Sequence, residues 1–201
     1  IMAGLVGSEM CIRDRNSGGP MSLEKLILHA AAPEPETISD QYYCSTCCRN
    51  VSSATRTFQF LCLPDCLFVS LSRFGFTFTS TQQGVIKRMD RISIPLVLDF
   101  PAGACGATTD STDLLRYGLC GIVAHVGKSA TNSHYVAYRR QAPWVQAPSL
   151  SECDANNWVL CNDSSVIFLC PDWFASYCAH GGHGDSTPYI LCFRRVATDS
   201  G

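Results

Sequence analysis

Apolar residues recur along the chain in two spacings, one typical of a helix and one typical of strands. Near the start, residues 22–28 carry three apolar side chains at positions i, i+3 and i+4, which predicts a short amphipathic helix. These side chains are Leu23, Leu26 and Ile27. Ser22 is a suitable N-cap for this helix, and Pro33 and Pro35 are expected to end it.

From residue 55 onward, short runs rich in β-branched and aromatic residues alternate with polar breaks, a pattern typical of strands. We predict strands over residues 55–61, 66–74, 85–94, 117–125, 134–139, 158–161, 165–169 and 189–196. Loops are predicted over residues 75–84 and 127–133, a variable loop over 101–113, an exposed insertion over 141–157 and a helical turn over 171–177. Because strands dominate and helices are segregated towards the N-terminal side, the pattern predicts an α+β fold.

The composition is that of a folded domain with a real core. Of the 201 residues, 46% are hydrophobic and 16% are charged, which excludes a disordered tail. The formal net charge is −2 and no basic block occurs, so we expect no nucleic-acid partner. No apolar run approaches the about 20 residues that a helix needs to cross a bilayer, so we expect no membrane partner.

The chain contains thirteen cysteines, a number that in a short secreted protein would indicate disulfides. Here the number is odd, and several cysteines, such as Cys62 and Cys192, lie within apolar runs. A buried free thiol behaves there as a small hydrophobic side chain. We therefore favour an intracellular protein of the cytoplasm or nucleus with mostly free thiols, and a disulfide-bonded secreted protein is the alternative.

Residues 1–15 are expected not to be native protein. Residues 5–15 read LVGSEMCIRDR, which is similar to the translation of a transposase adaptor used in DNA sequencing. Such a segment is excluded from reasoning about the fold. A genuine flexible terminus is the alternative. The protein proper is then residues 16–201, and we expect it to be part of a longer chain.

Two polar positions at predicted strand ends are the best candidates for catalysis. His134 stands between a polar loop and a strand, where a histidine can present one ring nitrogen to a cleft. Asn162 follows the apolar residues 158–161, and its side-chain oxygen could accept a hydrogen bond from the imidazole. Asp163 could do the same as a carboxylate. The alternatives are a structural histidine and an Asx turn over residues 162–164.

Nine short motifs resemble, in their order, those of the ubiquitin-specific protease (ubiquitin carboxyl-terminal hydrolase) family. They are Tyr42/Cys44/Cys47, Leu63-Pro64/Leu67, Leu71/Arg73-Phe74, Ile94-Pro95, Tyr117/Leu119, Val123/His125/Gly127/Ser129, His134-Tyr135/Tyr138, Trp158/Asn162-Asp163-Ser164/Val166 and Pro188-Tyr189-Ile190-Leu191. No single motif is specific for the family, but the order and spacing of the nine motifs over residues 42–191 are specific for it. By this resemblance, residues 16–201 are the C-terminal part of the family's catalytic domain.

The resemblance implies an α+β papain-like cysteine protease fold, mainly antiparallel, with the palm and part of the fingers but without the N-terminal thumb segment. It implies a thiol protease that acts on ubiquitin and ubiquitinated proteins by hydrolysing the isopeptide bond after the C-terminal glycine of ubiquitin. His134 would be the general base, Asn162 its orienting partner and Asp163 an assisting residue, without a catalytic cofactor. The family's nucleophilic cysteine lies in a Gly-Asn-Thr-Cys-like motif that this sequence lacks, so we expect the chain alone to be inactive.

Cys44 and Cys47 resemble the second half of the family's structural zinc site. A tetrahedral zinc ion needs four ligands, and this Cys-x-x-Cys turn supplies two, with the first pair expected upstream. Cys48 is adjacent to Cys47 and poorly placed to add a third ligand. Free thiols without zinc are the alternative.

Phe74, His125, Tyr135 and Tyr189 match family positions that line the channel for the ubiquitin tail. A narrow aromatic channel suits a Gly-Gly tail because it excludes larger side chains. Core packing is the alternative for Phe74 and Tyr189. The sequence departs from the family at Ser133, where glycine is usual, and a serine would be strained there if the position needs a positive φ.

Two classes of function stay open. The first is a deubiquitinating thiol protease, and the second is a catalytically inactive ubiquitin-binding or scaffold module that never had the cysteine. A zinc-ribbon interaction protein is a third interpretation, but it needs a second cysteine pair that the sequence does not show.

Overall fold

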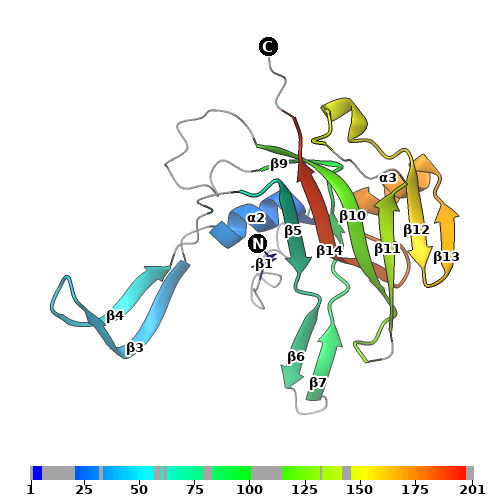
Figure 1. The fold of residues 1–201 in the computed structure, drawn as a ribbon. Coiled ribbons are helices and arrows are strands. Elements are labelled where there is room, and N and C mark those ends of the chain that lie inside the picture. Colours follow the sequence, from blue (N-terminus) through cyan, green and yellow to red (C-terminus); the bar gives the residue numbers. More distant parts are fainter. Residues whose placement is uncertain are drawn as a thin grey trace.

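An eight-stranded, mainly antiparallel sheet forms the centre of the molecule (Figure 1). The computed structural model describes residues 2–5, 21–31, 34–56, 60, 63–78, 83–100, 115–131, 133–141 and 146–197. The strands of the sheet are β1 (Met2–Leu5), β5 (Cys66–Leu71), β9 (Val97–Asp99), β10 (Arg116–Val126), β11 (His134–Arg140), β12 (Trp158–Asn162), β13 (Ser165–Phe168) and β14 (Ser186–Arg195). Their order is β1-β5-β14-β10-β11-β12-β13, with β9 paired to the first residues of β10.

The pairing in this sheet is antiparallel except between β1 and β5. Strands predicted over residues 117–125, 134–139 and 158–161 are therefore confirmed as β10, β11 and β12. The parallel pairing of β1 with β5 does not test whether residues 1–15 are native, so that interpretation stays a prediction.

The central strands β10 and β14 bury alternate side chains on one face of the sheet. Leu119 and Ile122 of β10, and Leu191 and Phe193 of β14, are each at most 1% exposed. Leu191 and Phe193 show the alternation that a strand with one buried face requires, whereas Leu119 and Ile122 are three residues apart because an irregularity lies between them. The register between the two strands shifts at Gly121, where an extra residue on β10 forms a β-bulge.

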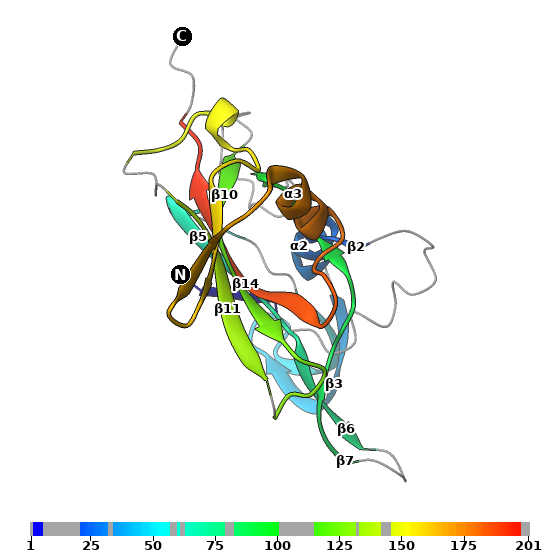
Figure 2. The ribbon, with the colours of Figure 1, turned by 90° about the vertical axis from the view of Figure 1, so that its right-hand side faces the viewer.

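The first helix, α2 (Leu23–Ala31), packs its apolar side against the sheet. Leu23 and Ile27 are buried, and the Ser22 hydroxyl oxygen accepts a hydrogen bond from the backbone N–H of Lys25 at 3.3 Å. The predicted helix and its N-cap are therefore confirmed. Figure 2 shows α2 and the second helix on the same side of the sheet.

That second helix, α3 (Pro171–Ala179), is longer than the helical turn predicted over residues 171–177. Proline suits its first turn because the missing N–H would have no helical partner there. Phe174, Tyr177 and Cys178 face the core. No helix in the described part of the chain has the length and apolar character needed to cross a membrane.

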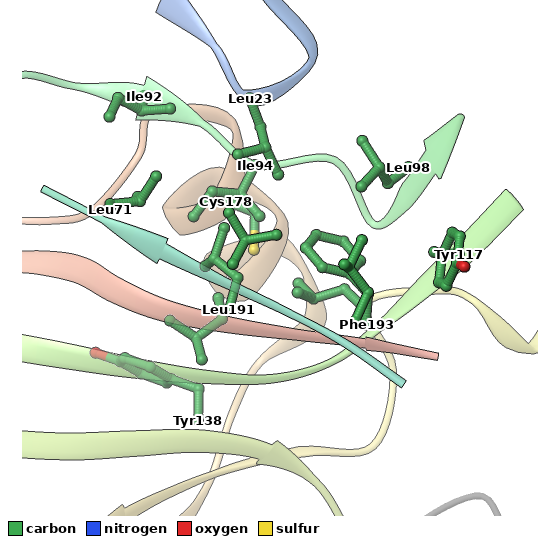
Figure 3. Packing of buried hydrophobic residues seen from close by; sticks show 14 of the residues in the cluster. Leu23, Leu71, Ile92, Ile94, Leu98, Tyr117, Tyr138, Cys178, Leu191 and Phe193 are labelled. Atoms are coloured by element: carbon green, nitrogen blue, oxygen red, sulfur yellow. The ribbon is translucent and has the colours of Figure 1, made fainter. Parts of the chain in front are cut away.

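The two helices and the sheet enclose one hydrophobic core (Figure 3). Leu23 from α2 and Cys178 from α3 point towards Leu191 and Phe193 on β14. At the far end of this core, the ring of Trp158 stacks on Phe174 with centroids 4.1 Å apart. The sheet is thus anchored to both helices by contacts that come from opposite ends of the sequence.

Two hairpins and a short strand pair lie outside the large sheet. The first hairpin, β3 (Glu34–Cys44) with β4 (Arg49–Arg56), projects away from the sheet in Figure 1. The second, β6 (Phe74–Phe78) with β7 (Gln83–Lys87), extends beyond the end of β5. β2 (Met21–Ser22) pairs in parallel with β8 (Ile92–Ser93).

The strand predicted over residues 66–74 is wrong in its length, because the chain leaves the sheet after Leu71. The last pair of the ladder between β14 and β5 is Ile190 with Ser70. To continue, the ladder would need a backbone N–H from Pro188, and proline has none to donate. The carbonyl oxygen of Pro188 instead accepts a hydrogen bond from Nε of the buried Arg73 at 2.8 Å. A buried cation therefore replaces the ladder at this point.

Other predicted boundaries also change. The loop predicted over residues 75–84 contains parts of β6 and β7, and the strand predicted over 85–94 is split between β7 and β8. The strand predicted over 55–61 overlaps only the end of β4 within the described residues. Within the insertion predicted over 141–157, Cys153 is buried, and residues Leu150–Glu152 form the 3-10 helix η3. The loop predicted over 101–113 lies outside the described residues.

We expect Phe174→Ala to lower the free energy of unfolding by about 3–5 kcal/mol, because it leaves a cavity in the aromatic stack with Trp158. Phe168→Ala is the control, since Phe168 is 69% exposed, and it should change the stability by about 0.5 kcal/mol or less. Urea unfolding followed by tryptophan fluorescence measures both values. Equal losses in the two variants would contradict this description of the core.

Candidate active site

His134 is the first residue of β11, and its ring contacts a residue of the neighbouring strand β12. The distance from His134 Nε2 to Asn162 Oδ1 is 2.5 Å. In the antiparallel ladder between β11 and β12, Ala137 pairs with Cys161. The next residue of β12, Asn162, therefore lies opposite Val136. Because side chains two apart on a strand share a face, His134 and Asn162 are diagonal neighbours.

Asp163 lies next to this pair but contacts it less closely. Its Oδ2 is 3.8 Å from His134 Nε2, and its side chain is 81% exposed. Asp163 adopts a φ of 49° in the turn that joins β12 to β13, whereas Asn162 is the last residue of β12. Asn162 pairs with Ser165 in the ladder and its side-chain oxygen is bonded to His134, while residues 163–164 form the turn, so the orienting contact and the polar turn occur together.

The hydrogen bond to Asn162 determines which ring nitrogen of His134 carries the proton. With the Asn162 oxygen as acceptor, Nε2 carries the proton, and Nδ1 is left with a lone pair that can accept a proton from a thiol. The side chain of His134 is 45% exposed, so a reacting group can reach it. Among the described cysteines, none forms a hydrogen bond with His134.

The four residues predicted to line a channel come together near His134. The ring of His125 is 5.0 Å, centroid to centroid, from the rings of both Phe74 and Tyr135. Tyr189 lies 5.6 Å from Phe74 and 6.0 Å from Tyr135. Four different strands, β6, β10, β11 and β14, therefore supply one aromatic cluster, which we call the aromatic quartet.

Within the aromatic quartet the exposure of the rings differs. Tyr135 is 48% exposed, whereas His125 is fully buried, so His125 supports the surface from below. Neither ring nitrogen of His125 has a hydrogen-bond partner among the described residues. Burial lowers the pKa of His125, and the positive charge of Lys87 lowers it further. His125 is therefore kept neutral by its surroundings.

Lys87 is a structural element of the site that the sequence analysis missed. Its ammonium group donates hydrogen bonds to the carbonyl oxygens of His125 at 3.0 Å, Gly127 at 2.6 Å and Asp185 at 3.0 Å. These carbonyls belong to the end of β10 and to the segment before β14. Lys87 thus anchors the base of the loop that leads to His134. A lysine on a strand usually points to solvent, so no sequence signal marks it.

The loop itself agrees with the prediction over residues 127–133. The strain considered for a serine at position 133 stays a prediction, because the structure does not describe the preceding residue. Gly127 has a positive φ of 124°, which glycine tolerates.

Cys44 and Cys47 lie at the turn of the β3–β4 hairpin, which confirms the predicted Cys-x-x-Cys turn. The backbone N–H of Cys47 donates to the Cys44 sulfur at 3.4 Å, and this hydrogen bond lowers the pKa of the Cys44 thiol. The Cys48 thiol donates to the Ser45 carbonyl oxygen instead. Within the described part of the chain, no group of three metal-ligating side chains forms.

Replacing His125 should change how stability depends on pH. Because the folded state lowers the pKa of His125 below the about 6.5 of an unfolded histidine, the unfolded state binds the proton more readily. The stability contributed by neutral His125 is complete above about pH 6.5 and is lost as the pH falls through the folded pKa. His125→Phe should flatten the decline in stability below about pH 6.5, measured by urea unfolding. The exposed His183, changed to Phe, is the control, and an unchanged slope in His125→Phe would contradict the assignment.

Comparisons with known proteins agree with the motifs. The family model for ubiquitin carboxyl-terminal hydrolase matches residues 35–193. Human ubiquitin carboxyl-terminal hydrolase 35 is 32% identical over 161 residues, which cover 78% of this chain and 15% of the relative. Ubiquitin carboxyl-terminal hydrolase 9 of Saccharomyces cerevisiae is 25% identical over 80% of this chain and 18% of its own length. The chain therefore spans less than a fifth of these relatives.

Solved structures show the same fold. A structure of the SAGA Ubp8/Sgf11/Sus1/Sgf73 DUB module bound to ubiquitin aldehyde contains a chain that matches with a TM-score of 0.62 and 19% identity. The match covers 89% of this chain and 34% of that chain. A related module with a Ubp8 variant matches with a TM-score of 0.63 and 18% identity, over 92% of this chain and 35% of that one. The α+β, papain-like fold is therefore confirmed, and the chain belongs to the ubiquitin carboxyl-terminal hydrolase family.

Proposed function

We propose that the chain is part of the catalytic domain of a cysteine-type deubiquitinase that hydrolyses the isopeptide bond after the C-terminal glycine of ubiquitin. The observation that carries this proposal is the hydrogen bond from His134 Nε2 to Asn162 Oδ1. This hydrogen bond would join two of the three members of a cysteine protease triad, the general base and the residue that orients it. Membership of the ubiquitin carboxyl-terminal hydrolase family supports the substrate class.

In this mechanism, His134 moves the proton at each step. Nδ1 accepts the proton of the nucleophilic thiol, and the resulting thiolate attacks the isopeptide carbonyl carbon. The imidazolium then gives its proton to the departing lysine amine. In the second half, His134 takes a proton from the water that hydrolyses the thioester. Asn162 keeps the ring in one tautomer and orientation throughout.

The nucleophile in this proposal comes from a part of the full-length protein that this chain does not include. The sequence has no Gly-Asn-Thr-Cys-like motif, and no described cysteine is bonded to His134. The chain spans only 15% of its human relative, which leaves room for such a segment. An inactive ubiquitin-binding scaffold is the second candidate, because the same absence fits it.

The aromatic quartet would hold the tail of ubiquitin. Tyr135 directly follows His134, and with Phe74 and Tyr189 it surrounds the buried His125. A glycine tail passes between close rings where a larger side chain would collide. A module that contains a chain of the same fold has been solved bound to ubiquitin aldehyde, which supports ubiquitin as a partner. Ubiquitinated proteins of the cytoplasm or nucleus would be the substrates of this activity.

A structural zinc ion is a further part of the proposal. Cys44 and Cys47 fit two positions of a tetrahedral site, since the N–H donor on the Cys44 sulfur favours its thiolate form. The remaining two ligands would come from a second cysteine pair outside this chain. Such an ion would hold the hairpin in shape and would take no part in the reaction.

In the full-length protein, we expect His134→Ala to lower kcat for a ubiquitin–fluorophore reporter by at least about 10²-fold, the contribution of a general base. Asn162→Ala should lower kcat less and leave KM nearly unchanged, since it disturbs the orientation of the ring and not substrate binding. Steady-state kinetics at several reporter concentrations separates the two parameters.

Asn50→Ala, at an exposed position of β4, is the matched control and should retain full activity. If His134→Ala keeps wild-type kcat, the catalytic assignment is wrong. If the full-length protein carries no cysteine in an Asn-x-Cys context upstream and binds ubiquitin without cleaving it, the scaffold function replaces the enzyme.

The chain alone, residues 1–201, should not cleave the same reporter at all, because it has no Gly-Asn-Thr-Cys-like motif and no cysteine among its described residues is hydrogen-bonded to His134. The assay is run at high enzyme concentration with the full-length protein as a positive control. Turnover by the chain alone that disappears in His134→Ala would show that one of its own cysteines is the nucleophile.

A further inference from the structure

Two thiols meet on the large sheet, away from the candidate active site. The Sγ atom of Cys120 on β10 is 3.2 Å from Sγ of Cys192 on β14. The Cys120 thiol also lies 3.2 Å from the carbonyl oxygen of Cys192. Both cysteines are free thiols, and their sulfur atoms contact each other across two paired strands.

A β-bulge brings these two residues together. Leu119 pairs with Phe193 and Gly121 pairs with Cys192, so Cys120 is the extra residue on β10 at this position. Leu119 and Phe193 face the core, whereas Cys120 and Cys192 are only partly buried. Gly121 adds no side chain beside Cys192, and a Cβ there would stand 3.6 Å from the Cys192 Cβ.

We propose that Cys120 and Cys192 form an oxidisable dithiol that closes to a cross-strand disulfide under a peroxide oxidant. In the bulge, Cys120 and Gly121 both oppose Cys192. The Cys120 and Cys192 sulfur atoms already lie 3.2 Å apart, so the two side chains point towards each other as a disulfide requires. The sulfur atoms must approach by about 1 Å more to reach bonding distance. Rotation of the two short side chains can supply this shift while both strands stay in the sheet.

The hydrogen bond between the thiols assigns their roles. Because Cys120 donates to the Cys192 sulfur, the pKa of Cys192 is lowered and the pKa of Cys120 is raised. Cys192 is therefore the sulfur that reacts first, since a thiolate is the nucleophile. Cys120 is the resolving thiol at its side.

The reaction balances with one molecule of hydrogen peroxide. The Cys192 thiolate attacks one peroxide oxygen, the O–O bond breaks, and hydroxide leaves as water after taking the thiol proton, which yields a sulfenic acid. The Cys120 sulfur then attacks the Cys192 sulfur and displaces hydroxide, which leaves as water with the Cys120 proton. In sum, two thiols lose two electrons and two protons, and peroxide is reduced to two waters.

The dithiol lies at a distance from the candidate active site. Cys120 is six residues before Val126, which pairs with His134, and six strand residues span about 20 Å. The inference therefore does not depend on the proposed function. A closed disulfide would join the two central strands of the sheet covalently.

The experiment uses the folded chain, checked by near-ultraviolet circular dichroism, and treats it with hydrogen peroxide before free thiols are blocked with N-ethylmaleimide. Trypsin with an Asp-directed protease releases residues 117–128 and 185–194, each with a single cysteine. Non-reducing mass spectrometry then detects whether these two peptides are joined. We expect the joined pair to appear, and a thiol reductant to release both peptides.

Three variants test the assignment. Cys120→Ser and Cys192→Ser should both lose the joined pair, while Cys170→Ser, at an exposed position before α3, should keep it. In Cys120→Ser, dimedone should label Cys192, and in Cys192→Ser it should label Cys120 much less, because the more acidic thiol reacts first.

The proposal is overturned if the joined pair is absent from folded wild-type protein while other cysteines oxidise, or if it forms only in urea. Equal dimedone labelling in the two serine variants would overturn the order of reaction. If either serine variant fails to fold, the wild-type and Cys170→Ser digests still decide the question. None of these results depends on deubiquitinase activity, so failure here leaves the proposed function untouched.

Discussion

The antiparallel register of β10 with its neighbours determines where His125, Tyr135 and His134 lie. A central strand must satisfy its backbone N–H and C=O groups on both edges, and β10 does so against β14 on one side and β9 and β11 on the other. This arrangement buries Leu119 and Ile122 in the core. It also places His125 directly opposite Tyr135 and Val126 opposite His134. The site therefore depends on the pairing of β10 with β11, to which β12 adds Asn162 and β6 adds Phe74.

Where the ladders end, the cationic side chains of the buried Arg73 and the half-buried Lys87 bind the backbone carbonyl oxygens. Arg73 binds the Pro188 carbonyl that closes the ladder between β5 and β14, and Lys87 binds three carbonyls beside the loop before His134. Carbonyl oxygens left without donors would cost free energy in a buried site. Hydrogen bonds from a charged donor are stronger than neutral ones. The β6–β7 hairpin, from which Lys87 comes, is thereby joined to the rim of the sheet.

The same sheet brings two chemically different pairs of side chains into contact, the imidazole of His134 with the amide of Asn162 and the thiols of Cys120 and Cys192. At one end, His134 and Asn162 share a face near the aromatic quartet, where strand ends open to loops and a substrate can approach. Further along, a bulge places two thiols side by side on rigid strands. In both places, the function depends on residues far apart in sequence that the register brings into contact.

The sequence alone determined the fold class and the family, since motif order and strand periodicity can be read along the chain. It also predicted the pair His134 and Asn162, whose side chains the structure joins by a hydrogen bond. It also predicted α2 with its Ser22 cap and the strand β10, because short-range periodicity specifies both. Tertiary structure decided the break after Leu71, the burial of His125, and the contacts of Lys87, Cys120 and Cys192. Each of these depends on which strand lies alongside and in which register, and that pairing is set by long-range packing that no local pattern records.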